Sequence, residues 1–295
     1  MVDISVIVIT KNEERNIAGC LNSLCALDYD NGEYEIIVCD SSSDKTPEIV
    51  RQFSKVRLFA VEKKGFGAAR NLGVAKARYD FIAFTDADCV VPRNWLTRLS
   101  SEITGFAGVG GSAFPPEGSG YFGKCIACLG YPAGGALGAD AAAGIISTCN
   151  AMFRKKALLS VGGFDEGLRW GGEDTALSKK LVAAGHKLKI DSNIFVWHKT
   201  RKLSEFFSWC FRRGFAKHGL GSSALQLLMP LSVFAYPFTK KFITLVKRRK
   251  KIGITAFSIL ITVPLLFFLR QLMISSGWLA GRIKNGNAEI IAGRL

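Results

Sequence analysis

Short apolar runs alternate with segments of helical spacing over the first 105 residues of the chain. The apolar runs are rich in β-branched residues, and polar loops or helical periods separate them. The predicted strands are Ile4–Ile9, Tyr34–Cys39, Arg57–Val61 and Asp80–Thr85, and the predicted helices are Glu14–Leu24, a helix with Thr46 as N-cap and Pro47 at its first position, Gly67–Ala77 and Pro92–Ile103. This alternation predicts an α/β fold with a mostly parallel central sheet and helices on both faces.

The pattern is weaker in the middle of the chain. Residues 106–147 are rich in Gly and Ala, and we expect a connecting region with some helix around Tyr121–Leu129. Beyond it, the pattern predicts a strand over Ile145–Phe153, a helix over Gly172–Ala184, and one or two closing strands within Lys187–Val196.

The C-terminal part of the chain is more apolar. The segment Phe206–Phe215 places aromatic residues beside basic ones, which is typical of a helix at a membrane interface. Ala224–Phe238 is a run of fifteen residues with two prolines, and Ile252–Leu269 has eighteen residues without a charge, close to the length of a membrane span. We therefore expect a catalytic domain over residues 1–205 and interfacial and transmembrane helices over 206–295.

The basic segment Lys247–Lys251 lies between the two apolar runs. If both runs crossed a bilayer, these cations would lie outside, against the positive-inside rule, and an interfacial or re-entrant first run avoids this. The alternative is that both runs are core helices of a soluble domain.

Composition narrows the class of partner. The chain has 295 residues, is 48% hydrophobic and carries a formal net charge of +15. This charge indicates an acidic partner, and because no nucleic-acid-binding motif is present, anionic membrane lipids and phosphorylated substrates are favoured. The eight cysteines lie mostly in apolar runs, and no secretory signal is visible at the N-terminus. We expect reduced thiols and a cytoplasmic catalytic domain at the cell membrane.

Polar clusters follow three of the predicted strands. They are Thr10–Glu13, Asp40–Asp44 and Asp86–Asp88. Ligands of such sheets bind beyond the carboxyl ends of the strands, so the three clusters are expected to share one edge. Asp86 and Asp88 offer the hard oxygen ligands that suit Mg²⁺ or Mn²⁺, and a metal there would stabilise a diphosphate leaving group. The alternative is a turn that caps the helix near Pro92.

The order of the clusters resembles that of family-2 glycosyltransferases. The matching strings are Val8–Glu13, Val38–Thr46, Gly67–Asn71, Asp86–Asp88, Thr148–Arg154, Val161–Glu166, Gly172–Asp174, Ala184–Lys187 and Val196–His198. The resemblance covers about residues 3–200 and is specific because many weak motifs occur in the same order. It implies a GT-A fold, a UDP- or GDP-sugar donor, and inverting hexosyl transfer that depends on Mg²⁺ or Mn²⁺.

The resemblance also implies roles for individual residues. Asp174 would be the general base that deprotonates the acceptor hydroxyl. The donor would be bound by Thr10, Asn12, Glu13, Asp40, Arg70 and Asp86, and the metal by Asp88 and Asp86, with His198 reaching back to it. The Gln-x-x-Arg-Trp motif of processive members is missing after Asp174, which favours transfer of a single sugar to a lipid-linked or membrane-presented acceptor.

Each role has a structural alternative. Asp40 and Asp44 would serve as helix caps, and Arg70 as a solvated helix charge. Acids in the first turn of a helix, such as Glu173 and Asp174, are favoured by the helix dipole alone, and His198 would be structural. A dehydrogenase is excluded because the first loop lacks Gly-x-Gly-x-x-Gly, and a nucleotidyltransferase is disfavoured because that loop is not rich in Gly. A non-catalytic membrane scaffold with a degenerate transferase domain remains an alternative.

Overall fold

The computed structural model describes residues 1–62, 65–129, 144–168, 171–218, 230–231, 246 and 253–292. These residues form two compact units. The first comprises Met1–Pro116 and Pro132–Lys199, and the second comprises Glu117–Tyr131 and Thr200–Leu295. Each unit is described separately below.

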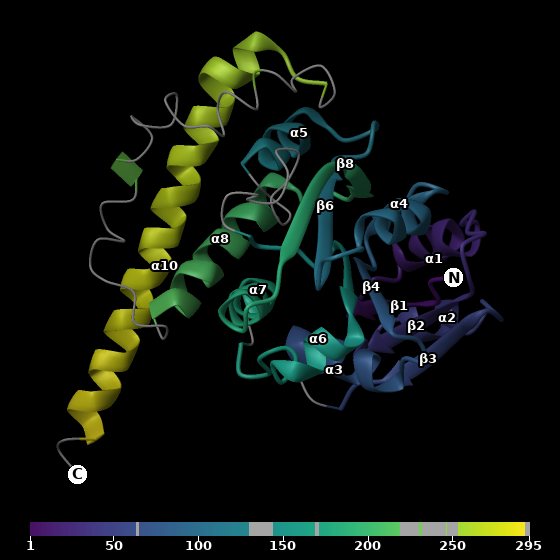
Figure 1. The fold of residues 1–295 in the computed structure, drawn as a ribbon. Helices are drawn as coiled ribbons and strands as arrows, with labels where there is room; N and C mark the ends of the chain where they lie inside the picture. The colour runs from purple at the N-terminus through teal and green to yellow at the C-terminus, as the bar shows by residue number, and fades with distance from the viewer. Residues whose placement is uncertain are drawn as a thin grey trace. The chain divides into compact units, whose positions relative to one another are not determined.

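An eight-stranded sheet forms the centre of the first unit (Figure 1). Its strands are β1 (Ile4–Thr10), β2 (Tyr34–Asp40), β3 (Val56–Ala60), β4 (Phe81–Asp86), β5 (Cys89–Val90), β6 (Gly108–Phe114), β7 (Asn150–Arg154) and β8 (Leu188–His198), in the spatial order β3-β2-β1-β4-β7-β6-β8-β5. The pairings among β1 to β4 are all parallel, as is that of β6 with β8, whereas β7 is antiparallel to both of its neighbours and β5 is antiparallel to β8.

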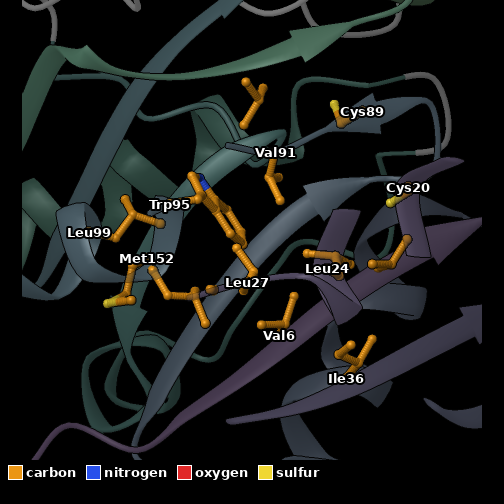
Figure 2. Close-up of a cluster of buried hydrophobic side chains, with 14 of the residues drawn as sticks. Val6, Cys20, Leu24, Leu27, Ile36, Cys89, Val91, Trp95, Leu99 and Met152 are labelled. Carbon is orange, nitrogen blue, oxygen red and sulfur yellow. The ribbon is translucent and has the colours of Figure 1, made fainter. Parts of the chain in front are cut away.

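Helices cover the sheet on both faces. They are α1 (Ile17–Cys25), α2 (Thr46–Val50), α3 (Phe66–Lys76), α4 (Trp95–Glu102), α6 (Lys155–Ser160) and α7 (Glu173–Ala183). Residues that alternate along a strand point to opposite faces, so Val6 packs with α1 and α4, while its neighbour Ile7 packs with α3, α6 and α7. Figure 2 shows the first of these two cores around Trp95, with Val6, Leu24 and Leu99 near it. The predicted α/β architecture is confirmed.

The strand register places the polar clusters together. Thr10 at the end of β1 lies opposite Asp40 at the end of β2, and Ile9 lies opposite Asp86 at the end of β4. The carboxyl ends of three parallel strands therefore meet at one edge, as the sequence predicts.

The structure differs from the prediction at several elements. The strand β6 lies in the region expected to be a connection, because its glycine-rich sequence has a single β-branched residue, Val109, and no clear period. The predicted strand from Ile145 starts at Asn150, and the N-cap of α2 is Lys45 rather than Thr46, which is the first helical residue. Here Asp44 Oδ1 accepts the Thr46 backbone N–H at 3.0 Å.

The second unit is helical. It contains α5 (Tyr121–Cys128), α8 (Leu203–His218), the π-helical turn η4 (Ser258–Thr262) and α10 (Val263–Ala292). The helix α8 packs along α10 so tightly that a Cβ at Gly214 would collide with the backbone of Ile274. Phe206 and Cys210 on α8 are buried.

Among the described helices, one stretch, Ser258–Gly281, is long and apolar enough to cross a bilayer. It contains most of the predicted segment Ile252–Leu269 and continues past Arg270. Large side chains at intervals of three or four residues are exposed along η4 and α10, namely Ile261, Leu265, Phe268 and Leu272. The other predicted apolar run, Ala224–Phe238, lies outside the described residues except at 230–231, as does the basic segment Lys247–Lys251.

Candidate active site

Two carboxylates and one imidazole lie together at the carboxyl edge of the sheet. Asp86 ends β4, Asp88 follows it by two residues, and His198 ends β8. His198 Nε2 lies 3.4 Å from Asp88 Oδ1 and 3.7 Å from Asp86 Oδ2. His198 Nδ1 lies 3.0 Å from the Lys199 carbonyl oxygen, which fixes the ring with Nε2 toward the carboxylates. Oxygen and imidazole nitrogen are ligands that suit Mn²⁺ and related divalent cations.

The charges of this cluster depend on one another. Burial alone would lower the pKa of His198, but the Asp88 and Asp86 carboxylates outweigh it and raise that pKa to about 9. Burial likewise opposes ionisation of Asp86, but the His198 imidazole and the Arg70 guanidinium hold the pKa of its carboxyl below the ordinary value. His198 and Arg70 therefore favour the ionised form of Asp86.

Arg70 joins this cluster to a second acidic residue. It lies on α3, and its Nη2 is 3.3 Å from Asp86 Oδ1 while its Nη1 donates to Glu173 Oε1 at 2.6 Å. The guanidinium also lies over the Phe164 ring, 5.7 Å from the centroid. Arg70 is buried, so the alternative of a solvated helix charge is wrong.

Glu173 and Asp174 occupy the first turn of α7. The preceding residue, Gly172, has φ +98°, a conformation that side chains other than glycine rarely adopt. Asp174 is half-buried, and its Oδ1 accepts the Thr175 N–H at 2.7 Å. Burial raises the pKa of Glu173, an effect that Arg70 partly offsets. Both acids thus lie where the helix dipole favours them, with Glu173 directed to Arg70.

The loop between α6 and α7 is fastened to α3 by Asn71. The Asn71 side chain accepts the Phe164 N–H at 2.9 Å and donates to the Phe164 carbonyl at 3.0 Å and to Glu166 Oε1 at 3.0 Å. Gly67 lies so close to the backbone of Asp165 that a Cβ there would collide with it. These contacts hold the chain that leads into α7.

A second group of predicted residues lies at the ends of β1 and β2. Thr10 and Asp40 are buried beside each other, and Asp40 accepts hydrogen bonds from the Ser42 hydroxyl at 2.6 Å and the Ser42 N–H at 3.2 Å. Asp40 therefore hydrogen-bonds within the loop that follows β2 and does not cap a helix. Asp44, in contrast, accepts a hydrogen bond from the first turn of α2.

Asn12 and Glu13 fasten the first loop to the second. Asn12, with φ +58°, accepts the Ser43 N–H at 2.8 Å, and the Glu13 N–H donates to Thr46 Oγ1 at 2.9 Å. Both residues lie beside the polar edge, and these hydrogen bonds hold the first loop against the second.

Two buried oxygens at this edge have no hydrogen-bond partner among the described residues, namely Thr10 Oγ1 and Glu173 Oε2. A buried polar atom without a partner is costly, and a bound ligand is a common explanation for it. Thr10 lies at the end of β1, one residue after the partner of Asp86 in the sheet, and Glu173 lies next to Asp174 and bonds to Arg70, which also contacts Asp86.

Sequence reasoning missed three features of this site. It treated Glu173 as a first-turn acid without assigning it a partner, left Asn71 without a role, and did not connect Cys89 with the cluster. The thiol of Cys89, one carboxylate oxygen of Asp88 and one ring nitrogen of His198 lie within 4.8 Å of one another. The adjacency of Asp88 and Cys89 in the sequence was visible, but the approach of His198 depends on the fold.

Comparison with known families decides the class of this protein. The profile of glycosyl transferase family 2 matches residues 5–162, and a profile described as the N-terminal domain of galactosyltransferase matches residues 139–205. The chain belongs to glycosyltransferase family 2. The resemblance seen in the sequence is thereby confirmed.

Individual relatives agree with this assignment. Glycosyltransferase AglE of Haloferax volcanii is 31% identical over 232 residues, which cover 72% of this chain and 71% of that protein. Beta-monoglucosyldiacylglycerol synthase of Trichormus variabilis is 38% identical over 104 residues, covering 32% of this chain and 22% of that protein.

A solved structure shows the same fold. The mannosyltransferase PcManGT from Pyrobaculum calidifontis, in complex with GDP-Man and Mn²⁺, superposes with a TM-score of 0.61 at 19% identity and covers 91% of this chain and 86% of its own. This family-2 glycosyltransferase therefore has the GT-A fold.

Proposed function

We propose that this glycosyltransferase transfers one sugar from a UDP- or GDP-sugar to a lipid-linked or membrane-presented acceptor, with inversion at the anomeric carbon. The observation that carries the proposal is the meeting of His198 with Asp86 and Asp88, beside Arg70, at the carboxyl edge of the sheet. The GDP-Man and Mn²⁺ bound by the mannosyltransferase structure support a nucleotide-sugar donor and a divalent metal here.

The donor set fits Mg²⁺ or Mn²⁺. Asp88 would hold the metal with Asp86 and His198, whose ligand atoms already face one another. When bound, the metal neutralises the diphosphate and stabilises it as a leaving group. His198 and Arg70 supply positive charge that favours the ionised form of Asp86, which is the form that binds a metal.

The donor would bind between the two unsatisfied oxygens. Thr10 and Asp40, with Asn12 and Glu13 on the adjacent loop, would form the base and ribose pocket, where Thr10 Oγ1 is buried and free to bond. Arg70 would stand near the ribose and phosphates, because its planar cation fits a diphosphate and it already contacts Asp86.

Asp174 would act as the general base. Its carboxylate takes the proton of the acceptor hydroxyl, the acceptor oxygen forms a bond to the anomeric carbon, and the bond from that carbon to the diphosphate oxygen breaks. A single displacement of this kind inverts the anomeric configuration. The neighbouring contact from Glu173 to Arg70 supports this assignment, since it ties the first turn of α7 to the proposed donor site.

Substituting Asp88 tests the metal and the donor together. We expect Asp88→Asn to raise the Mn²⁺ concentration needed for donor-dependent release of nucleoside diphosphate by about tenfold or more, because one anionic ligand is lost. A thermal-shift screen of UDP-, GDP- and dTDP-sugars with and without Mn²⁺ first identifies the donor. The release of nucleoside diphosphate from that donor is then measured at increasing Mn²⁺ concentrations.

The matched control is Asp80→Asn, which makes the same change just before the other end of β4. It should leave the Mn²⁺ requirement unchanged. An unaltered requirement in Asp88→Asn would remove the metal assignment, and a wild-type chain that releases no nucleoside diphosphate with any donor would instead favour a non-catalytic scaffold.

The membrane part of the proposal rests on the apolar helix. Exposed leucines along Ser258–Gly281, together with the net charge of +15, support attachment to a membrane with anionic lipid, with the catalytic domain in the cytoplasm. An acceptor held at the headgroup plane would suit an enzyme fixed there. The synthase relative, whose name refers to a glucosylated diacylglycerol, supports a lipid acceptor.

We expect Leu265→Asp with Leu272→Asp to release the chain from the membrane fraction after carbonate washing. Each Asp costs about 3 kcal/mol at the centre of a spanning helix. The same chains are then assayed for nucleoside diphosphate release with a polyprenyl phosphate in vesicles and with a water-soluble sugar, and the wild type should prefer the lipid.

The matched control replaces Leu159 and Val182, which are exposed apolar residues of the first unit, by Asp. This variant should remain in the membrane fraction. A wild-type chain that stays soluble without detergent would contradict membrane attachment, and equal rates with both acceptors would contradict the lipid acceptor.

A further inference from the structure

Cys89 lies directly opposite His198 in the sheet. The short strand β5 pairs antiparallel with the end of β8, and the register matches Cys89 to His198 and Val90 to Trp197. Residues directly opposite in an antiparallel pair carry their side chains on the same face of the sheet. The Lys199 N–H donates to the Asp88 carbonyl at 3.0 Å, which continues the pairing and holds Asp88 beside the same pair.

This pairing brings sulfur to the proposed metal ligands. One ligand atom each from Asp88, Cys89 and His198 lies within 4.8 Å of the others. A divalent cation holds sulfur at about 2.3 Å and nitrogen or oxygen at about 2.0–2.2 Å, so two of its ligand atoms lie within about 4.5 Å of each other. Three ligands of one cation at angles of about 90–120° lie about 3–4 Å apart, which His198 Nε2 and Asp88 Oδ1 already meet at 3.4 Å, and a shift of the Cys89 sulfur by about 1 Å or less would bring it to the same cation.

The surroundings of Cys89 leave its sulfur available. The side chain is buried, and its thiol makes a weak contact with the Cys149 carbonyl oxygen, 4.0 Å away. Figure 2 shows Cys89 toward one end of the core cluster, away from Trp95. A thiol at that end of the core can bind the cation from the protein side, while Asp88 is partly open to solvent.

We propose that Cys89 is a sulfur ligand of the metal and gives the site a preference for Mn²⁺, Co²⁺ or Zn²⁺ over Mg²⁺. The inference rests on the proposed function for its other ligands, Asp88 and His198. Thiolate is a soft ligand that Mg²⁺ disfavours, whereas the later first-row cations accept it. The thiol releases its proton when the sulfur binds the cation.

Two other buried cysteines provide matched controls. The Cys20 thiol donates to the Asp86 carbonyl at 3.5 Å, and Cys149 is buried next to Cys89. Both are near the same carboxylates, but neither belongs to the group whose ligand atoms meet. An effect of burial or of thiols in general would therefore appear with Cys149 as well as with Cys89.

The test is optical spectroscopy of the full chain, purified in detergent and titrated with Co²⁺. Visible d–d absorption reports that Co²⁺ is bound, and a near-ultraviolet sulfur-to-cobalt charge-transfer band reports a sulfur ligand. We expect both in the wild type and in Cys149→Ala. Cys89→Ala should keep the d–d absorption and lose the charge-transfer band, and Cys89→Ser checks the result with a side chain of nearly the same size.

A second measurement follows the choice of metal. Mn²⁺ binding is followed by electron paramagnetic resonance with Mg²⁺ as competitor, and Cys89→Ala should lower the preference for Mn²⁺ over Mg²⁺ by about 10- to 100-fold, the range typical of losing a partner at a metal site. Cys149→Ala should keep the wild-type preference.

The outcomes separate this inference from the proposed function. Bound Co²⁺ without a charge-transfer band in the wild type, or loss of the band in Cys149→Ala, overturns the role of Cys89 and leaves the Asp88 and His198 site standing. A wild-type chain that binds neither Co²⁺ nor Mn²⁺ overturns both, whereas a band that depends on Cys89 alone, with the change in metal preference, supports the inference.

Discussion

Replacing Asp174 by Asn is expected to lower the rate of sugar transfer by about 10²- to 10⁴-fold, the contribution typical of a general base, while donor binding is retained. Asn has nearly the size of Asp, and its side-chain oxygen still accepts the Thr175 N–H that Asp174 accepts at 2.7 Å. The first turn of α7 should therefore keep its conformation. What is lost is the basicity that the proposed mechanism requires.

The experiment measures single-turnover transfer and donor affinity for Asp174→Asn and for Asp191→Asn. Asp191 is a matched control because it is also half-buried and its Oδ1 also accepts a backbone N–H, that of Asn193 at 2.8 Å. Transfer at the wild-type rate in Asp174→Asn would remove the base assignment. A product with the anomeric configuration of the donor would contradict inversion, whatever the variant does.

The N-terminal half of the sheet was predictable because its strands are local patterns. The run Ile4–Ile9 is apolar and β-branched, and the structure places β1 at Ile4–Thr10. The shared polar edge was predictable as well, since parallel strands joined by helices end on the same side. The register that sets Thr10 opposite Asp40 follows from this topology.

The strand β6 was not predictable in the same way. Its sequence is Gly-Val-Gly-Gly-Ser-Ala-Phe. Close contacts with neighbouring strands, rather than strand propensity, explain the glycines. A Cβ at Gly108 would meet the Phe153 ring at 2.5 Å, and one at Gly111 would meet the Ile194 carbonyl at 2.2 Å. Residues distant in the sequence leave no room for a side chain at these positions. Because glycine is otherwise typical of loops, the sequence alone predicts a loop here.

The candidate site also has a part that the sequence predicts and a part that depends on the fold. Asp86 and Asp88 stand two residues apart at the end of a strand, and residue chemistry alone identifies them as a pair. The approach of His198 to them and the burial of Arg70 against Glu173 depend on how α3, α7 and β8 meet the sheet. A family resemblance suggested the histidine, whereas nothing local distinguishes a buried arginine on a helix from a solvated one.

Truncating Arg70 is expected to destabilise the first unit by about 3–5 kcal/mol, because it leaves the buried Glu173 carboxylate without a compensating charge. The two side chains are 5% and 6% exposed and their atoms lie 2.6 Å apart. Arg70→Met keeps much of the side-chain volume and removes the cation. Asp86, 3.3 Å from Arg70, loses a second favourable contact in the same variant.

Glu173→Gln in the same chain should restore much of the loss, since a neutral amide needs no cation, and the double-mutant cycle isolates the coupling of the pair. The free energy of unfolding is measured by denaturant titration of the full chain in detergent. Arg93→Met is the matched control. Arg93 donates two hydrogen bonds to Asp28, at 2.9 Å and 3.0 Å, but the side chains are 72% and 60% exposed, so solvent screens the pair and the expected loss of stability is much smaller. If Arg70→Met costs no more than Arg93→Met, or if Glu173→Gln brings no recovery, the ion pair does not hold α7 to α3. Recovery of stability without recovery of transfer would instead indicate that Arg70 also has a role toward the donor.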